Sequence, residues 1–175
     1  MEIDPAAAAA LGFPKLKYAW VERERRWLCG DIPMDRVISA DSIADLYVTG
    51  TRLRLREATP LDGGPPMRRL TRKADVDAAT RLLTSIYLAP EEFALLSGLP
   101  GKIIRKTRHR LALERGVTMS VDRFEGALAG LILAEREFET HEEMASFLAP
   151  DFCVREVTDD PRYAGGALVR DGVPA

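Results

Sequence analysis

Apolar and polar residues alternate in short stretches along most of the chain. Residues two apart in a strand share a face, so this alternation predicts half-buried strands. The stretches that show it are Tyr18–Leu28, Ala44–Val48, Thr51–Glu57, Met67–Lys73, Arg81–Leu88, Lys102–Leu113, Val117–Phe124 and Gly130–Glu139. Most of the segments between them contain turn residues, such as Asp62-Gly63-Gly64.

Two stretches break this alternation and predict helices. Pro90–Leu96 opens with a proline and two acids and is followed closely by Gly98, as is typical of a helix start and end. Thr140 has Glu143 three residues later, which predicts a capped helix that runs as far as Leu148.

Many short strands and few helices predict one mainly β domain of antiparallel strands, either a barrel or a sandwich. We place this domain at residues 17–175. Residues 1–16 mix alanines with Pro5, Gly12 and Pro14, and we expect them to form a flexible leader.

Composition narrows the class of protein. Across 175 residues, 25 Lys and Arg stand against 27 Asp and Glu, a balance that argues against a general nucleic-acid binder. No uncharged apolar run approaches the roughly 20 residues of a membrane helix. With only Cys29 and Cys153, we expect two reduced thiols in a cytoplasmic protein, not a disulfide scaffold.

Charged residues of one sign share strand faces. The acidic faces carry Glu22 and Glu24, followed by Arg26, and Glu135 with Glu137. The basic faces carry Arg52, Arg54 and Arg56, then Arg69 and Lys73, then Lys106, Arg108 and Arg110. A solvated sheet face is one explanation. The other is a closed barrel whose acidic wall binds a divalent cation while the basic walls hold a polyanion such as a triphosphate.

Several short motifs follow one another in the chain. They are Glu22-Arg23-Glu24-Arg25-Arg26, Thr51–Arg56, Leu70-Thr71-Arg72-Lys73, Lys106-Thr107-Arg108, Val121–Gly126, Leu131–Phe138 and Glu156–Tyr163. In this order they resemble the motifs of the CYTH family, the triphosphate tunnel metalloenzymes. That family includes inorganic triphosphatases, thiamine triphosphatases and class IV adenylate cyclases.

The resemblance implies a closed eight-stranded antiparallel β-barrel that forms a triphosphate tunnel, with a few helices packed outside. It also implies hydrolysis of inorganic triphosphate, or of a nucleoside or other organic triphosphate, with Mg²⁺ or Mn²⁺. The implied metal ligands are Glu22, Glu24, Glu135 and Glu137. The implied triphosphate-binding residues are Arg26, Arg54, Arg56, Lys73, Lys106 and Arg108, with Arg52 and Asp122 as additional site residues.

Some positions depart from the family pattern. Arg26 replaces a lysine, Leu83 and Ser85 replace glutamates, and Ala164 replaces a lysine that often follows the closing tyrosine. These departures keep two alternatives open: a non-catalytic module that binds polyphosphate or nucleotides, and an adenylate cyclase of the class IV type. We expect no nucleic-acid or membrane partner, and a homodimer is the default expectation.

Overall fold

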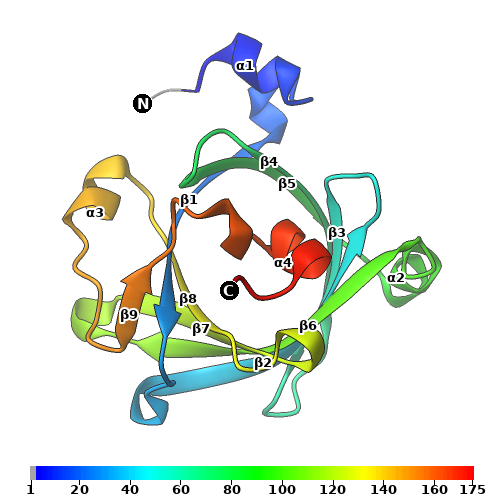
Figure 1. Ribbon diagram of the computed structural model, residues 1–175. Coiled ribbons are helices and arrows are strands. Elements are labelled where there is room, and N and C mark those ends of the chain that lie inside the picture. Colours follow the sequence, from blue (N-terminus) through cyan, green and yellow to red (C-terminus); the bar gives the residue numbers. More distant parts are fainter. Residues whose placement is uncertain (1–2) are drawn as a thin grey trace.

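A computed structural model describes residues 3–175 and contains a closed antiparallel β-barrel. Its strands are β1 (Trp20–Cys29), β2 (Val37–Val48), β3 (Leu53–Pro60), β4 (Met67–Asp75), β5 (Thr80–Tyr87), β6 (Gly101–Ala112), β7 (Thr118–Phe124) and β8 (Ile132–Glu137). They follow the order β5-β4-β3-β2-β6-β7-β8-β1, and pairing of β1 with β5 closes the ring (Figure 1). The expected eight-stranded antiparallel barrel is confirmed.

The strand bounds differ from the sequence pattern mainly in β2 and β9. We expected a strand from Ala44, but β2 begins at Val37 because it pairs with β6 along its whole length, from Val37 opposite Leu111 to Val48 opposite Gly101. The short strand β9 (Cys153–Glu156) was not predicted, and it pairs with β1 beyond the segment that contacts β5.

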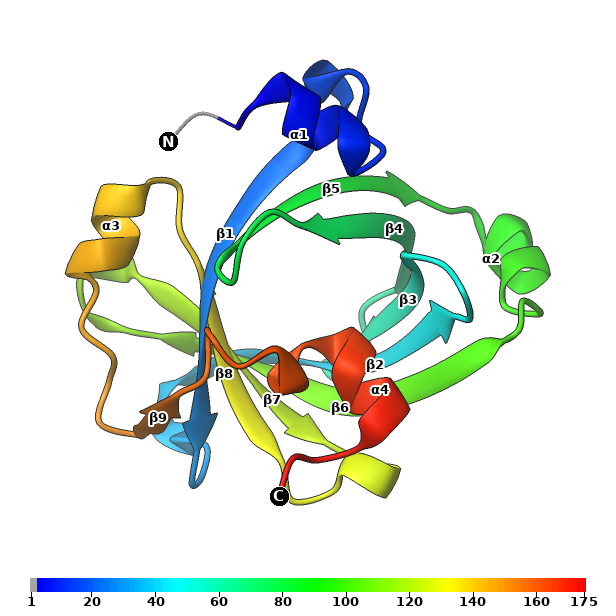
Figure 2. The same cartoon turned by 45° about the horizontal axis from the view of Figure 1, so that its top comes forward.

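Apolar side chains on the outer face of the barrel pack against short helices. Helix α2 (Pro90–Leu96) contacts β4, and its Phe93 packs against an apolar cluster that contains the buried Leu46 of β2 and Leu55 of β3. Its bounds are those predicted. Helix α2 and two further helices, α1 (Pro5–Ala10) and α3 (His141–Ser146), lie at separate places around the ring (Figure 2).

Helix α3 covers the largest of the outer clusters. Trp27, Leu111 and Phe138 are buried there, and the loop after α3 adds Phe147. The Thr140 hydroxyl accepts a hydrogen bond from the Glu143 amide at 3.1 Å, which confirms the predicted cap. The helix ends at Ser146 and does not continue to Leu148 as expected.

The segment before β1 packs on the outside of β4 and β5. Ala8 and Phe13 are buried against Ala74 and Leu82, and the Leu11 carbonyl accepts hydrogen bonds from two arginine side chains of the barrel. The division into a leader (1–16) and a domain (17–175) stays a prediction. Residues 1–2 of the leader lie outside the described residues.

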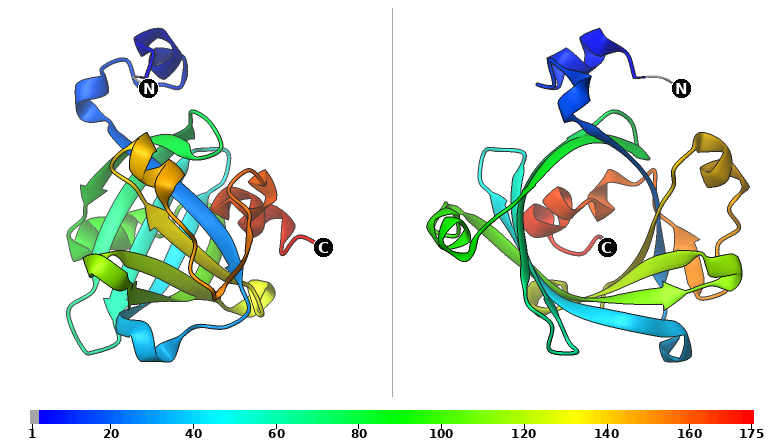
Figure 3. Two further views of the ribbon diagram at one scale, coloured as in Figure 1. Left: turned by 90° about the vertical axis from the view of Figure 1, so that its left-hand side faces the viewer. Right: turned by 180° about the vertical axis from the view of Figure 1, so that it is seen from behind.

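Helix α4 (Gly165–Asp171) lies across one end of the barrel (Figure 3). Its Leu168 is buried against Ile104 and Leu133, which point into that end. Gly165 fits only because it has no Cβ: such an atom would overlap the Tyr47 hydroxyl. The sequence predicted a few helices packed outside the barrel, and α4 adds one that lies across its end.

Across residues 3–175, we find no helix that combines the length and the apolar character needed to cross a membrane.

Candidate active site

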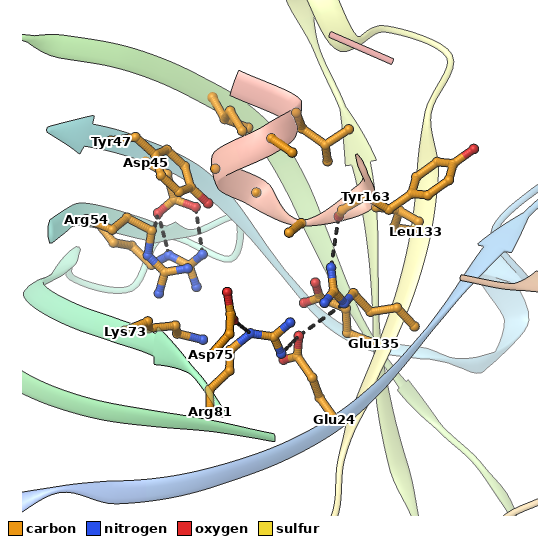
Figure 4. A pocket seen from close by; sticks show the side chains of 18 of the residues that line it. Glu24, Asp45, Tyr47, Arg54, Lys73, Asp75, Arg81, Leu133, Glu135 and Tyr163 are labelled. Carbon is orange, nitrogen blue, oxygen red and sulfur yellow. Dashed lines mark hydrogen bonds and ion pairs between the residues drawn. The ribbon is translucent and has the colours of Figure 1, made fainter. Parts of the chain in front are cut away.

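The barrel encloses a cavity of about 430 Å³ that opens toward solvent and is bordered by α4. Most of the site residues that the sequence indicates line this one cavity: Glu22, Glu24, Arg26, Arg52, Arg54, Arg56, Lys73, Lys106, Arg108, Glu135 and Glu137. Asp122 lies behind the lining, fully buried. Arg110 shares a strand face with Lys106 and Arg108 but is exposed and bonds Thr118. The structure therefore places the candidates together, with acidic and basic groups facing each other (Figure 4).

Four glutamates on two neighbouring strands make up the acidic wall. In the β1–β8 pair, Glu24 lies opposite Glu137 and Arg26 lies opposite Glu135. Glu22 is two residues before Glu24 and thus shares its face. Both β1 glutamates are buried, whereas Glu137 is exposed. Strand pairing alone therefore brings four carboxylates to one side of the tunnel.

Burial and repulsion between neighbouring carboxylates raise the pKa values of two glutamates in the acidic wall. Burial, reinforced by the charge of Glu135, raises the pKa of Glu24. Partial burial and the charge of Glu22 raise the pKa of Glu137. Since each carboxylate makes ionisation of its neighbours harder, the wall favours a bound cation.

Basic side chains already contact three of these glutamates. Lys73 donates to Glu22 over 2.6 Å, Arg81 donates to Glu24 over 2.6 Å, and Arg108 donates to Glu135 over 2.7 Å. Arg26 Nε also lies 3.2 Å from Glu24 Oε1, and its Nη1 donates to the Tyr163 carbonyl. Among the described residues, Glu137 has no such partner.

Asp122 holds the cations of the β6 wall in place. Its carboxylate, with no exposed surface, accepts from Lys106 at 2.5 Å and from two nitrogens of Arg108 at 2.7 Å each. Burial works to raise the pKa of Asp122, but Arg108 and Lys106 outweigh it and lower that pKa. They do the same to Glu135, whose pKa lies well below the usual range despite burial.

Asp45, which the sequence reasoning missed, anchors the opposite basic wall. It is almost fully buried on β2 and accepts two hydrogen bonds of 2.7 Å from Arg56, while Arg54 Nε lies 3.7 Å away. Burial favours the neutral acid, yet Arg56 and Arg54 hold the pKa of Asp45 well below normal. The available signal was that Asp45 is the single acid in the predicted strand Ala44–Val48, two residues from Tyr47.

Arg81 and Arg69 also line the cavity, and the motifs did not single them out as site residues. Arg81 contacts Asp75 through Nε at 2.9 Å, besides Glu24. It shares the inner face of β5 with Leu83 and Ser85, and Ser85 shares a hydrogen bond of 2.7 Å with Thr71. At the two positions where the family pattern has glutamates, this wall therefore carries an apolar side chain and a hydroxyl.

The donor set of the acidic wall fits a hard divalent cation, because it consists of carboxylate oxygens. Within residues 3–175, however, no group of three or more acidic, histidine or cysteine side chains is already gathered around a common ion position. The ion pairs of Glu22, Glu24 and Glu135 explain this, since each holds its carboxylate toward a basic side chain.

No family model matches the sequence. Over 69 residues the chain is 44% identical to an inorganic triphosphatase of Acetivibrio thermocellus, a match that covers 39% of this chain and 42% of that protein. An inorganic triphosphatase of Nitrosomonas europaea is 37% identical over 68 residues, which cover 39% of this chain and 45% of that protein. The chain thus spans less than half the length of the curated relatives it matches.

Solved structures share the fold over most of the chain. The crystal structure of an inorganic triphosphatase has a TM-score of 0.58 at 24% identity, covering 88% of this chain and 97% of that one. A protein from Pyrococcus horikoshii has a TM-score of 0.54 at 23% identity, covering 71% and 82%. Together with the curated relatives, this shared fold confirms the resemblance to triphosphate tunnel enzymes that the motifs indicate.

Proposed function

We propose that the chain is a divalent-cation-dependent hydrolase that cleaves inorganic triphosphate, or a small triphosphorylated compound, inside its tunnel. One observation carries the proposal: a cavity of about 430 Å³ in which an acidic wall faces walls of arginine and lysine. A triphosphate with its cation is the kind of ligand that needs both. The names of the curated relatives, inorganic triphosphatases, support the same substrate.

In this proposal the acidic wall of Glu22, Glu24, Glu135 and Glu137 holds Mg²⁺ or Mn²⁺. Such an ion supplies Lewis acidity toward phosphoryl oxygens and water. Lys73, which now bonds Glu22, is free to turn toward a phosphate once that carboxylate binds a cation. The exchange replaces one set of ion pairs by another, so neither group is left uncompensated.

The basic walls bind and orient the phosphate chain. Arginine presents a planar fork that contacts two phosphate oxygens at once. Arg56 and Arg108 are each held by two hydrogen bonds to a buried aspartate, so their remaining donors point in fixed directions. A water that attacks the terminal phosphorus would then meet a substrate whose oxygens are already fixed, and the arginine and lysine side chains would stabilise the charge on the leaving diphosphate.

Release of phosphate from inorganic triphosphate, with Mg²⁺ or Mn²⁺ and with EDTA, tests the proposal directly. We expect turnover that requires the metal, and at least about a tenfold loss in Glu137→Gln, which removes a charge from the acidic wall. Glu139→Gln is the matched control, because Glu139 is an exposed residue just beyond β8. Absence of metal-dependent turnover in the wild-type chain would contradict the proposal.

The non-catalytic alternative rests on Leu83 and Ser85, since the inner face of β5 lacks acids. It predicts that calorimetry detects triphosphate binding while hydrolysis stays negligible. Formation of cyclic AMP from ATP would instead favour the cyclase alternative.

A further inference from the structure

Among residues 3–175, each basic side chain that lines the tunnel has a hydrogen-bond or ion-pair partner except Arg69 on β4. Arg54 and Arg56 share Asp45, and Lys73 contacts Glu22. Even Arg52 at the rim donates to the Leu11 carbonyl. By contrast, Arg69 makes no side-chain hydrogen bond or ion pair with any residue from 3 to 175, and its Nε is buried without a partner.

The neighbours of Arg69 make its charge harder to accommodate. Strand pairing sets Arg69 directly opposite Arg56, and like charges in that position destabilise a sheet. Burial, followed by the charges of Arg56 and Arg54, lowers the pKa of Arg69. Three guanidinium groups therefore lie at this part of the tunnel, and only Arg54 and Arg56 contact the carboxylate of Asp45.

Arg69 also lies at the far end of the basic wall from the glutamates. Lys73 and Arg69 both point into the tunnel from β4, and four residues of strand separate their Cα atoms by about 13 Å. Lys73 bonds the acidic wall through Glu22. A phosphate chain held between the two walls would thus place one end near the glutamates and the other near Arg69.

We propose that Arg69 is a further substrate-binding residue, which binds the phosphoryl group at the end of the chain farther from the acidic wall. This inference rests on the proposed function, because it takes a phosphate chain to be the ligand. A terminal phosphoryl group carries more negative charge and one more free oxygen than an inner one, so it matches a binding site where the positive charge of Arg69 is not balanced. This binding site therefore selects linear phosphate chains that end in a free phosphoryl group.

Binding without turnover tests this, with the metal removed by EDTA. Isothermal calorimetry compares linear triphosphate with cyclic trimetaphosphate, which has no terminal phosphoryl group. We expect Arg69→Gln to weaken linear triphosphate binding by about ten- to hundredfold, the loss of charge-assisted hydrogen bonds. Binding of the cyclic compound should change by less than about threefold.

The control variant is Arg68→Gln, one residue away on the outer face, where Arg68 pairs with Glu57. It should leave both affinities within about twofold. Thermal unfolding without ligand adds a readout of opposite sign: because Arg69 is unpaired among like charges, Arg69→Gln should unfold at the same temperature as the wild type or higher.

Three results would overturn the inference. They are unchanged binding of linear triphosphate in Arg69→Gln, an equal loss for the linear and cyclic compounds, and a clearly lower unfolding temperature of the ligand-free variant. These outcomes are independent of catalysis. A wild-type chain that binds triphosphate but never hydrolyses it contradicts the proposed function and leaves the role of Arg69 intact.

Discussion

Replacing Asp122 by asparagine tests whether one buried carboxylate holds the β6 wall together. Asp122 has no exposed surface and bonds both Lys106 and Arg108. Asparagine keeps the volume but removes the charge, so two cations lose their counter-ion inside the barrel. Breaking a buried ion pair from one side costs about 3–5 kcal/mol.

The lower part of that range applies here. Arg108 keeps a second partner in Glu135, and 21% of its side chain is exposed, so solvent screens part of its charge. For a chain of this size, about 3 kcal/mol corresponds to a fall in Tm of roughly 6–12 °C. Solvent screens the charge of Lys106 less, because its side chain is only 8% exposed.

Thermal unfolding followed by circular dichroism measures this shift, in a buffer free of phosphate and other polyanions that could replace the lost charge. Asp151→Asn is the control, because the Asp151 side chain is 85% exposed and lies 3.6 Å from Arg36. That variant should shift Tm by less than about 2 °C. If Asp122→Asn behaves like this control, Lys106 and Arg108 do not depend on Asp122 and the reasoning fails.

Two further predictions concern acid stability and α4. The folded-state pKa values of Asp45 and Glu135 lie below normal. Their contribution to the free energy of unfolding is therefore present above about pH 4–5 and is lost as the pH falls further. A urea midpoint that stays flat from about pH 7 to about pH 3 would contradict this. Gly165→Ala should lower Tm by several degrees, because its Cβ would overlap the Tyr47 hydroxyl, whereas Gly166→Ala, with open space around it, should leave Tm unchanged or slightly raised.

The alternating pattern was enough to predict most of the barrel, because each strand keeps one apolar face. The alternating pattern failed to predict segments that form a strand because they pair with a neighbouring strand and not because their own residues alternate. The first half of β2 exists through its ladder with β6, and tertiary pairing of this kind overrides local preference. Helix α4 begins at Gly165-Gly166, two residues that favour a loop locally, and the packing of Leu168 accounts for it.

The sequence likewise predicted only part of the candidate site. Motifs singled out the glutamates and most of the basic residues, since these repeat at every second position. Asp45 and Arg81 stand outside the motifs, so their place in the cavity follows only from closure of the barrel and the register between strands. Arg69 also stands outside the motifs, but the alternation put it on the same strand face as Lys73. Arg110 shows the converse, because face sharing did not bring it into the tunnel.

The barrel has its charged residues inside and much of its apolar packing outside, under α1, α2 and α3. Each strand thus devotes alternate residues to two separate tasks. Substitutions of lumen side chains outside the ion pairs of Asp45 and Asp122 change the charge of the cavity while the hydrophobic contacts outside the sheet stay untouched. Exchange of a peripheral helix, conversely, can adjust heat tolerance while the lumen side chains stay in place, so an engineer can vary stability and the charge of the cavity largely apart in one small scaffold.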